Sequence, residues 1–168
     1  MNRLATICAR SGSKGLKNKN KLELFGVPLY KRAILQAVDC GYFDFIAVSS
    51  DDTEILENAL SVGADLAVLR PAELSTDLAS KPQTIRHATL QAELAFGSVF
   101  DIVADLDVTS PLRLNSDIGG TLQVLESGKH SSVVTVSECH RNPYFNLIEK
   151  FENRTFAPAK KNKYRISC

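Results

Sequence analysis

Short apolar runs alternate with amphipathic stretches along most of the chain. Five runs have the length and composition of buried parallel strands, at residues 3–9, 43–50, 64–70, 99–108 and 130–138. Between them, apolar residues three and four positions apart predict helices over residues 28–41, 51–63, 82–97 and 115–127. After residue 142 this periodicity fails. This alternation predicts an α/β fold with a three-layer, doubly wound, mainly parallel sheet, in a single domain over residues 1–168.

The helix ends carry recognisable signals. Asp51 or Asp52 is expected to cap the N-terminus of the second predicted helix, and Gly63 stands just past its end. Asn115 or Ser116 is expected to cap the last predicted helix. In sheets of this kind, ligands bind beyond the carboxyl ends of the strands. Candidate site residues are therefore expected just after the predicted strands, at 10–20, 49–52, 70–81 and 105–113.

Composition and charge narrow the function classes. The chain has 20 Lys and Arg residues against 19 Asp and Glu residues, a formal charge of +1, which argues against general binding to nucleic acid or to a membrane surface. No leader peptide and no membrane-spanning run is visible. The four cysteines lack metal-site spacing, and Cys8, within the first predicted strand, is expected to be a buried small hydrophobe. We therefore expect a cytoplasmic protein with reduced thiols.

A basic loop, ARSGSKGLKNKN at residues 9–20, follows the first predicted strand and contains no acid. Gly12 and Gly15 are expected to let the backbone turn its N–H groups inward as an anion-binding nest, with Lys14 between them. The loop matches neither GxxxxGK[ST] nor GxGxxG. Its place after the strand favours phosphate binding over the alternative, a solvated basic turn.

Two carboxylates end the fourth predicted strand. Asp105 and Asp107 are two positions apart, so in strand geometry they project from the same face and can converge at the carboxyl edge of the sheet. Carboxylates there suit Mg²⁺, a hard cation that bridges to substrate phosphates. The alternative is that one carboxylate caps the following loop and the other is solvated. Arg113, beyond the rigid Thr109-Ser110-Pro111 turn, is either an anion contact or an exposed charge.

Four blocks of the chain resemble a known family. ARSGSKGLKNKN, SSDD, LRPAELSTD and LDVTSPLR occur in the order and spacing typical of the sugar-activating cytidylyltransferases, especially the acylneuraminate (CMP-sialic acid) synthetases. The resemblance implies a Rossmann-like fold of the nucleotide-diphospho-sugar transferase type. It also implies transfer of CMP from CTP to a nine-carbon 2-keto sugar acid, with Mg²⁺ as cofactor, release of pyrophosphate and a homodimer. No nucleic-acid or membrane partner is expected.

The resemblance also implies roles for individual residues. Arg10 and Lys14 would be catalytic, because they would neutralise charge that develops on the phosphates. The nucleotide would be held by Arg10, Ser13, Lys14, Gly15, Asn20, Arg70 and Ser80. The sugar would be held by Asp107, Thr109 and Ser110, and the metal by Asp105 and Asp107.

The chain departs from the family pattern at two points. Asp107 and Val108 stand where the family usually has Gln followed by Pro or Ala, and an ionised Asp can only accept hydrogen bonds. This change favours a different nonulosonate, such as legionaminic or pseudaminic acid, over a metal role for Asp107. The chain also stops at Cys168, where family members continue, so we expect it to lack the family's C-terminal portion. Two alternatives to CMP transfer onto a nonulosonic acid stay open: a CMP-Kdo-type sugar nucleotidyltransferase and a non-catalytic nucleotide-binding fragment.

Overall fold

The computed structural model describes residues 1–12, 15–76, 78–136, 148–150 and 156–158 of the chain. The chain forms two compact units, residues 1–133 and 134–168. In the second unit, β7 (Ile148–Lys150) pairs antiparallel with β8 (Phe156–Pro158). All the site residues predicted from the sequence belong to the first unit.

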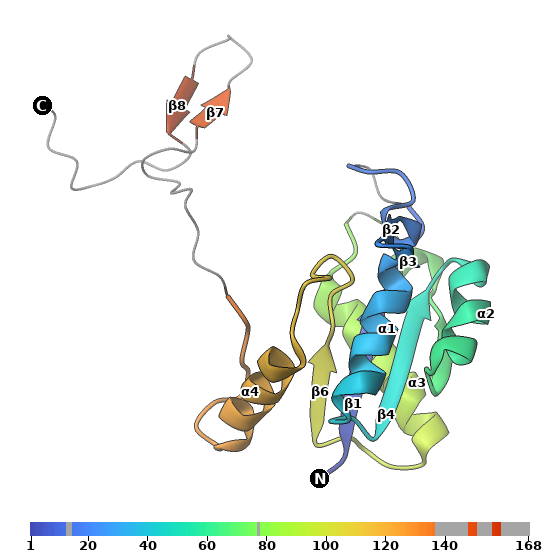
Figure 1. The fold of residues 1–168 in the computed structure, drawn as a ribbon, viewed down its shortest axis with the longest axis vertical. Coiled ribbons are helices and arrows are strands. Elements are labelled where there is room, and N and C mark those ends of the chain that lie inside the picture. The colour runs from blue at the N-terminus through green and yellow to red at the C-terminus, as the bar shows by residue number, and fades with distance from the viewer. Residues whose placement is uncertain (13–14, 77, 137–147, 151–155, 159–168) are drawn as a thin grey trace, which may run out of the picture. The chain divides into compact units, whose positions relative to one another are not determined.

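A four-stranded parallel sheet forms the centre of the first unit (Figure 1). Its strands are β1 (Arg3–Cys8), β4 (Phe45–Ser50), β5 (Leu66–Leu69) and β6 (Ile102–Asp105), in the spatial order β5-β4-β1-β6. The central strand β1 pairs with β4 on one side and with β6 on the other, and all pairings are parallel. The strand order reverses direction at β1, so the crevice beyond the carboxyl end of β1 is where a ligand is expected.

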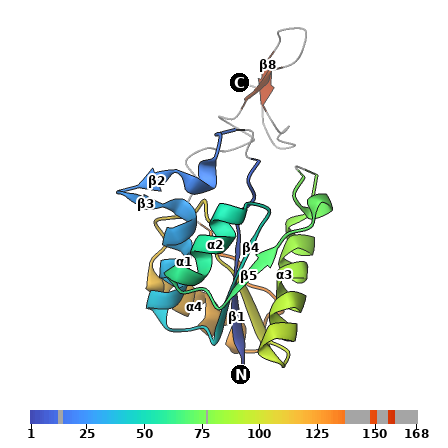
Figure 2. The ribbon, with the colours of Figure 1, turned by 90° about the vertical axis from the view of Figure 1, so that its right-hand side faces the viewer.

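Helices cover both faces of the sheet, which gives the three layers expected from the sequence (Figure 2). One face packs against α1 (Leu29–Cys40), α2 (Thr53–Val62) and α4 (Asn115–Glu126) in the larger core cluster, which includes Ile7, Ile34 and Ile55. The other face packs against α3 (Lys81–Phe96) through Leu4, Ala47, Ala92 and Phe100. Alternate residues of β1 serve the two clusters, as the period of two in a strand requires.

Two helix starts test the predicted caps. Asp52 is the N-cap of α2, and its carboxylate accepts a hydrogen bond from the N–H of Glu54. At α4 the prediction of Asn115 or Ser116 is wrong, because the N-cap is Leu114. The carboxylate of Asp117 accepts a hydrogen bond from the Leu114 N–H at 2.8 Å, so an acid inside the first turn satisfies the backbone there.

One predicted strand is absent and one hairpin is new. Residues 131–136, most of the predicted strand 130–138, have no strand structure, and residues 137–138 lie outside the described residues. Between the basic loop and α1, β2 (Glu23–Leu24) and β3 (Val27–Pro28) form a hairpin. Phe25 and Gly26 both have positive φ, at 52° and 75°, as a two-residue hairpin turn of type I′ requires.

Candidate functional site

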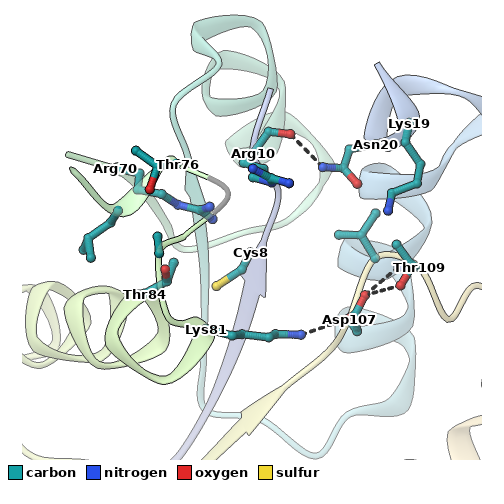
Figure 3. A pocket seen from close by; sticks show the side chains of 13 residues that line it. Cys8, Arg10, Lys19, Asn20, Arg70, Thr76, Lys81, Thr84, Asp107 and Thr109 are labelled. Carbon is teal, nitrogen blue, oxygen red and sulfur yellow. Dashed lines mark hydrogen bonds and ion pairs between the residues drawn. The ribbon is translucent and has the colours of Figure 1, made fainter. Parts of the chain in front are cut away.

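A cavity of about 290 Å³ lies beyond the carboxyl end of β1. Its walls come from the end of β1, the basic loop, the segment after β5, the start of α3 and the turn after β6. The lining residues are Cys8, Arg10, Lys19, Asn20, Arg70, Leu74, Thr76, Ala79, Lys81, Thr84, Asp107, Val108 and Thr109. Figure 3 shows Arg10, Arg70, Lys81 and Asp107 around the Cys8 side chain, each from a different segment.

Residues 51–54, at the start of α2, bind the basic loop near both of the loop's ends. The Ser11 N–H and hydroxyl donate to the two carboxylate oxygens of Asp51, at 2.8 and 2.6 Å. Burial opposes ionisation of Asp51, but the two bonds from Ser11 outweigh it and lower the pKa of Asp51. At the other end, Lys21 Nζ forms ion pairs with Asp52 at 2.7 Å and with Glu54 at 2.6 Å. These contacts therefore fix the positions at which the chain enters and leaves the loop.

Asn20 closes the loop on itself. The residue is 8% exposed, and its Nδ2 donates to the backbone carbonyl of Arg10 at 2.9 Å. This bond joins the two ends of the loop beside the cavity, where Arg10 and Lys19 contribute to the lining. A Cβ at Gly12 or Gly15 would meet nothing within 4 Å, and Asn18 has a left-handed backbone with φ of 53°. Asn18 therefore adds a left-handed turn that the sequence interpretation did not expect, and the predicted nest around Lys14 lies partly outside the described residues.

Arg70 brings a buried positive charge to the opposite wall. It is 6% exposed, and its Nε and Nη2 donate to the hydroxyl and carbonyl oxygens of Ser49, at 3.2 and 2.7 Å. Burial lowers the pKa of Arg70 from its ordinary value, but a guanidinium remains charged in a protein. Both acceptors are neutral, and Arg70 lines the same cavity as Arg10 and Lys19.

Lys81 lies between the two predicted metal ligands. Its Nζ is 2.7 Å from Asp105 Oδ2 and 2.5 Å from Asp107 Oδ2. Burial disfavours the charged form of Lys81, but the bonds to both carboxylates outweigh it and raise its pKa. The strand ends at Asp105, so Asp107 belongs to the following turn. The two carboxylates do converge as the sequence predicts, and they converge on an ammonium group.

The second oxygen of each carboxylate is also engaged. Asp107 Oδ1 accepts from the N–H and hydroxyl of Thr109, at 2.8 and 2.6 Å, and Asp105 Oδ1 accepts from the Thr6 hydroxyl at 3.3 Å. Among the described residues, no group of three or more His, Cys, Asp or Glu side chains is arranged to hold a metal ion. The described donor set therefore does not fit a metal held by protein side chains alone.

Arg113 supports the turn that carries Asp107. Its Nη2 donates to the Asp107 carbonyl at 2.8 Å, and its Nη1 donates to Gln36 Oε1 at 3.0 Å. Gln36 in turn donates to the carbonyls of Pro111 and Arg113, at 3.1 and 2.9 Å. Arg113 is thus a structural clamp between α1 and this turn, a role that neither sequence alternative gave it.

The Cys8 thiol lies at the floor of the cavity and stays protonated. Burial, together with the nearby charge of Asp105, raises its pKa to about 12. A thiol with such a pKa is a poor nucleophile at neutral pH. Cys8 is partly exposed to the cavity, so the expectation of a fully buried small side chain is only approximately right.

The Asp107 contacts predict an acid-dependent loss of stability. Burial alone would raise the pKa of Asp107, but the bonds from Lys81 and Thr109 lower it from 3.8 to about 2. A depressed folded-state pKa stabilises the fold above the unfolded-state pKa, and this contribution is lost as pH falls from about 4 towards 2. Urea unfolding at pH 5, 4 and 3 should show a shallower loss of stability for Asp107→Asn than for the wild type. Parallel curves would contradict the ion pair. Asp107 is half-exposed, so solvent screening reduces the effect.

The cavity gathers part of the predicted site. Arg10, Asn20, Arg70, Asp107 and Thr109 line it. Four other predicted residues are described and do not line it: Gly15, Ser80, Asp105 and Ser110. Ser80 is the N-cap of α3, next to Lys81. Ser13 and Lys14 lie outside the described residues.

Two lining cations, Lys19 and Lys81, fall within the candidate segments but were not singled out by sequence reasoning. Lys19 was one of several lysines in the basic loop, and nothing local distinguished it from its neighbours. Lys81 begins the helix after the third predicted strand, where the expected crevice lies, so its position was the one available signal. Its two partners are more than twenty residues away, and no local pattern connects them.

The fold is that of an open parallel α/β protein, in which ligands bind beyond the carboxyl ends of the strands, and the cavity lies at that edge. The chain belongs to the Cytidylyltransferase family, whose family model matches residues 4–154. The sequence-level resemblance is confirmed by this match. In the part of the chain that the structure describes, no helix is long and apolar enough to cross a membrane.

The chain is similar to several curated relatives. It is 39% identical over 146 residues to post-translational flagellin modification protein B of Campylobacter coli, a match that covers 87% of this chain and 62% of that protein. It is 36% identical over 151 residues to CMP-N,N'-diacetyllegionaminic acid synthase of Campylobacter jejuni, covering 90% of this chain and 64% of the synthase. It is 33% identical over 163 residues to N-acylneuraminate cytidylyltransferase of Escherichia coli, a match that covers 96% of this chain and 38% of that protein. The chain therefore spans less than two thirds of the length of these relatives.

A solved structure supports the fold. The CMP:2-keto-3-deoxy-manno-octonic acid synthetase complexed with CTP superposes with a TM-score of 0.59, at 20% identity, and the match covers 76% of this chain and 48% of that one. At this identity the likeness concerns the fold alone, and it agrees with the α/β class predicted from the sequence.

Proposed function

We propose that the protein transfers CMP from CTP to a nonulosonic sugar acid, giving the CMP-sugar and pyrophosphate. The observation that supports this most is the set of cations on the cavity wall, Arg10, Lys19 and Arg70, at the carboxyl edge of a cytidylyltransferase-family sheet. A triphosphate carries several negative charges, and three convergent cations offset their repulsion at one place.

In the proposed reaction, the anomeric hydroxyl of the sugar attacks the α-phosphorus of CTP. The new bond joins the sugar oxygen to this phosphorus, the bond to the pyrophosphate oxygen breaks, and the hydroxyl proton is released. The protein's task is to align the two substrates and to neutralise charge on the phosphates. This role is supported by the lining of the cavity, which has Arg10 and Lys19 on the loop side and Arg70 on the opposite side. Lys14, expected from the sequence to be catalytic, remains part of the proposal.

The sugar acid is proposed to be a relative of sialic acid, such as legionaminic or pseudaminic acid. The similar proteins include a CMP-N,N'-diacetyllegionaminic acid synthase and pseudaminic acid cytidylyltransferases of Campylobacter jejuni. A flagellin modification protein is also among them, so the CMP-sugar is proposed to serve the glycosylation of flagellin or of a surface polysaccharide. Thr109 and Ser110 remain the proposed sugar contacts, whereas Asp107 is held between Lys81 and Thr109.

Three further features belong to the proposal. Mg²⁺ is expected to assist the reaction and to enter with the triphosphate that it coordinates, since Asp105 and Asp107 already hold Lys81. A homodimer and a cytoplasmic location are expected from the family resemblance and from the sequence.

Binding calorimetry with CTP, UTP and ATP, each with Mg²⁺ and with EDTA, tests the nucleotide half of the proposal. We expect CTP to bind at least about tenfold more tightly than UTP or ATP, which corresponds to about 1.4 kcal/mol. A mass-spectrometric assay of the intact gene product, with CTP and several nonulosonic acids, tests the transfer. Equal affinity for the three nucleotides would contradict the proposal.

The alternatives give different results in the same assays. Selective CTP binding without any CMP-sugar would indicate a non-catalytic nucleotide-binding protein. Product formed only with the eight-carbon acid Kdo would indicate the CMP-Kdo-type transferase.

A further inference from the structure

We infer that Lys81 is an anion contact for the substrate, and that Asp105 and Asp107 serve to aim this lysine rather than to bind a divalent cation. The inference rests on the proposed function and names a residue of its site that the sequence resemblance did not assign. The anion is either a phosphate of CTP or the carboxylate of the sugar acid, because both present the same acceptor oxygens to an ammonium group.

The position of Lys81 is the first reason. Lys81 is the first residue of α3, and Figure 3 shows its side chain reaching across the cavity towards Asp107. The side chain is 47% exposed although its Nζ contacts two carboxylates. An ammonium group has three N–H donors, and these contacts use two of them. The remaining donor is available for a ligand in the cavity that Lys81 lines.

The contacts of the two carboxylates are the second reason. Each carboxylate uses one oxygen for Lys81 and the other for a hydroxyl group, from Thr6 for Asp105 and from Thr109 for Asp107. Thr109 adds its backbone N–H to Asp107. These hydrogen bonds fix the orientation of both carboxylates, and the fixed carboxylates hold the Lys81 ammonium group in one place. A fixed cation loses less conformational entropy on binding an anion than a free lysine side chain does.

The charge arrangement also argues against a metal at this pair. A divalent ion between Asp105 and Asp107 would have to displace an ammonium group that contacts both of them at 2.7 Å or less. The displaced ammonium would then face a second positive charge within a few ångströms. The Cys8 thiol lies near Asp105. Even so, no group of three or more His, Cys, Asp or Glu side chains among the described residues is arranged to hold a metal ion. Lysine therefore takes the place that a metal ion has in a carboxylate pair.

The experiment compares Lys81→Met, Lys81→Arg, Asp107→Asn and the double variant with the wild type in the intact protein. CTP is titrated with Mg²⁺ and, separately, with EDTA. N,N'-diacetyllegionaminic acid is titrated into protein saturated with a non-hydrolysable CTP analogue. Lys129→Met, which removes an exposed lysine that does not line the cavity, is the matched control. Thermal unfolding of every variant verifies that it is folded.

We expect Lys81→Met to weaken one of the two ligands about 10- to 100-fold, the range of a hydrogen bond to a charged group. The ligand that loses affinity identifies the source of the anion. Lys81→Arg should restore most of the affinity, and Lys129→Met should leave it unchanged. Asp107→Asn should weaken the same ligand to a smaller degree, with EDTA as well as with Mg²⁺. It should add nothing in the Lys81→Met background, because Asp107 acts through Lys81.

Several outcomes would overturn the inference. Unchanged affinity of folded Lys81→Met for both ligands would remove Lys81 from the site. An Asp107→Asn effect seen only with Mg²⁺, or one that persists in Lys81→Met, would make the carboxylate a metal ligand or a direct contact. If the wild type does not prefer CTP, the proposed function fails, while the Lys81 comparison is still decided with inorganic tripolyphosphate. If the wild type binds none of these anions, both the proposed function and the role of Lys81 are rejected.

Discussion

Replacing Arg70 by methionine is expected to weaken CTP binding by more than about 100-fold, or about 2.8 kcal/mol. The Arg70 guanidinium is already buried in the free protein and is held by two hydrogen bonds to Ser49. Because it has lost most of its water before the ligand arrives, its attraction to a phosphate is opposed by little further desolvation. Calorimetry with CTP measures the loss directly.

Arg70→Lys is the informative companion variant. Lysine retains the charge, but it cannot direct two parallel donors at Ser49 as the planar guanidinium does. We therefore expect Arg70→Lys to recover only a small part of the affinity. Removal of a buried charge offsets the loss of its hydrogen bonds, so Arg70→Met should unfold within about 1 kcal/mol of the wild type. A folded Arg70→Met that binds CTP normally would contradict the assignment of Arg70 to the nucleotide site.

Gly63→Ala is expected to destabilise the protein by about 2–4 kcal/mol, from backbone strain and overpacking together. Gly63 is the C-cap of α2, with φ of 115°, a value that residues with a side chain rarely adopt. A Cβ at this position would lie 2.9 Å from Val38 Cγ2 on α1. The substitution therefore combines a strained backbone with a steric clash between two helices, and urea unfolding measures the sum.

Two variants separate these contributions. Gly97 is the C-cap of α3, with φ of 78°, and a Cβ there would meet nothing within 4 Å. Gly97→Ala should therefore show backbone strain alone, about 1–2 kcal/mol. Val38→Ala should recover part of the loss when it is combined with Gly63→Ala, because it removes the clashing methyl groups. Equal destabilisation by Gly63→Ala and Gly97→Ala would show that Val38 moves aside at no cost.

The sheet could be predicted from local patterns because each of its strands is a short apolar run. The four runs that became strands are each followed by a helix or a turn with clear signals, and a parallel sheet is the arrangement that buries them. Residues 131–136 have the same alternation and form no strand. A strand is stable only when a neighbour satisfies its backbone, and that neighbour is not encoded locally. The hairpin of β2 and β3 was missed because two-residue strands have no period to detect.

The sequence predicts those residues of the candidate site whose position follows from the loop that carries them, but not the contacts between loops. The place of Arg10 and Asn20 follows from their position after the first strand, and that of Asp107 from its position after the fourth. The contact between Lys81 and the two carboxylates depends on the distance between α3 and β6, which only the tertiary fold sets. Arg113 shows the same limit, since its partner Gln36 lies on α1.

Residues 51–54, which lead into and begin α2, contribute no side chain to the cavity, yet they bind both ends of the loop that does. Asp51, Asp52 and Glu54 therefore hold the loop that forms one wall of the cavity. The Lys21 anchor consists of ion pairs, so added salt should loosen it, whereas the Ser11 anchor is formed by a neutral donor and should be less sensitive. Substitutions at the start of α2 would thus alter the affinity for a substrate in the cavity, although none of these residues lines it.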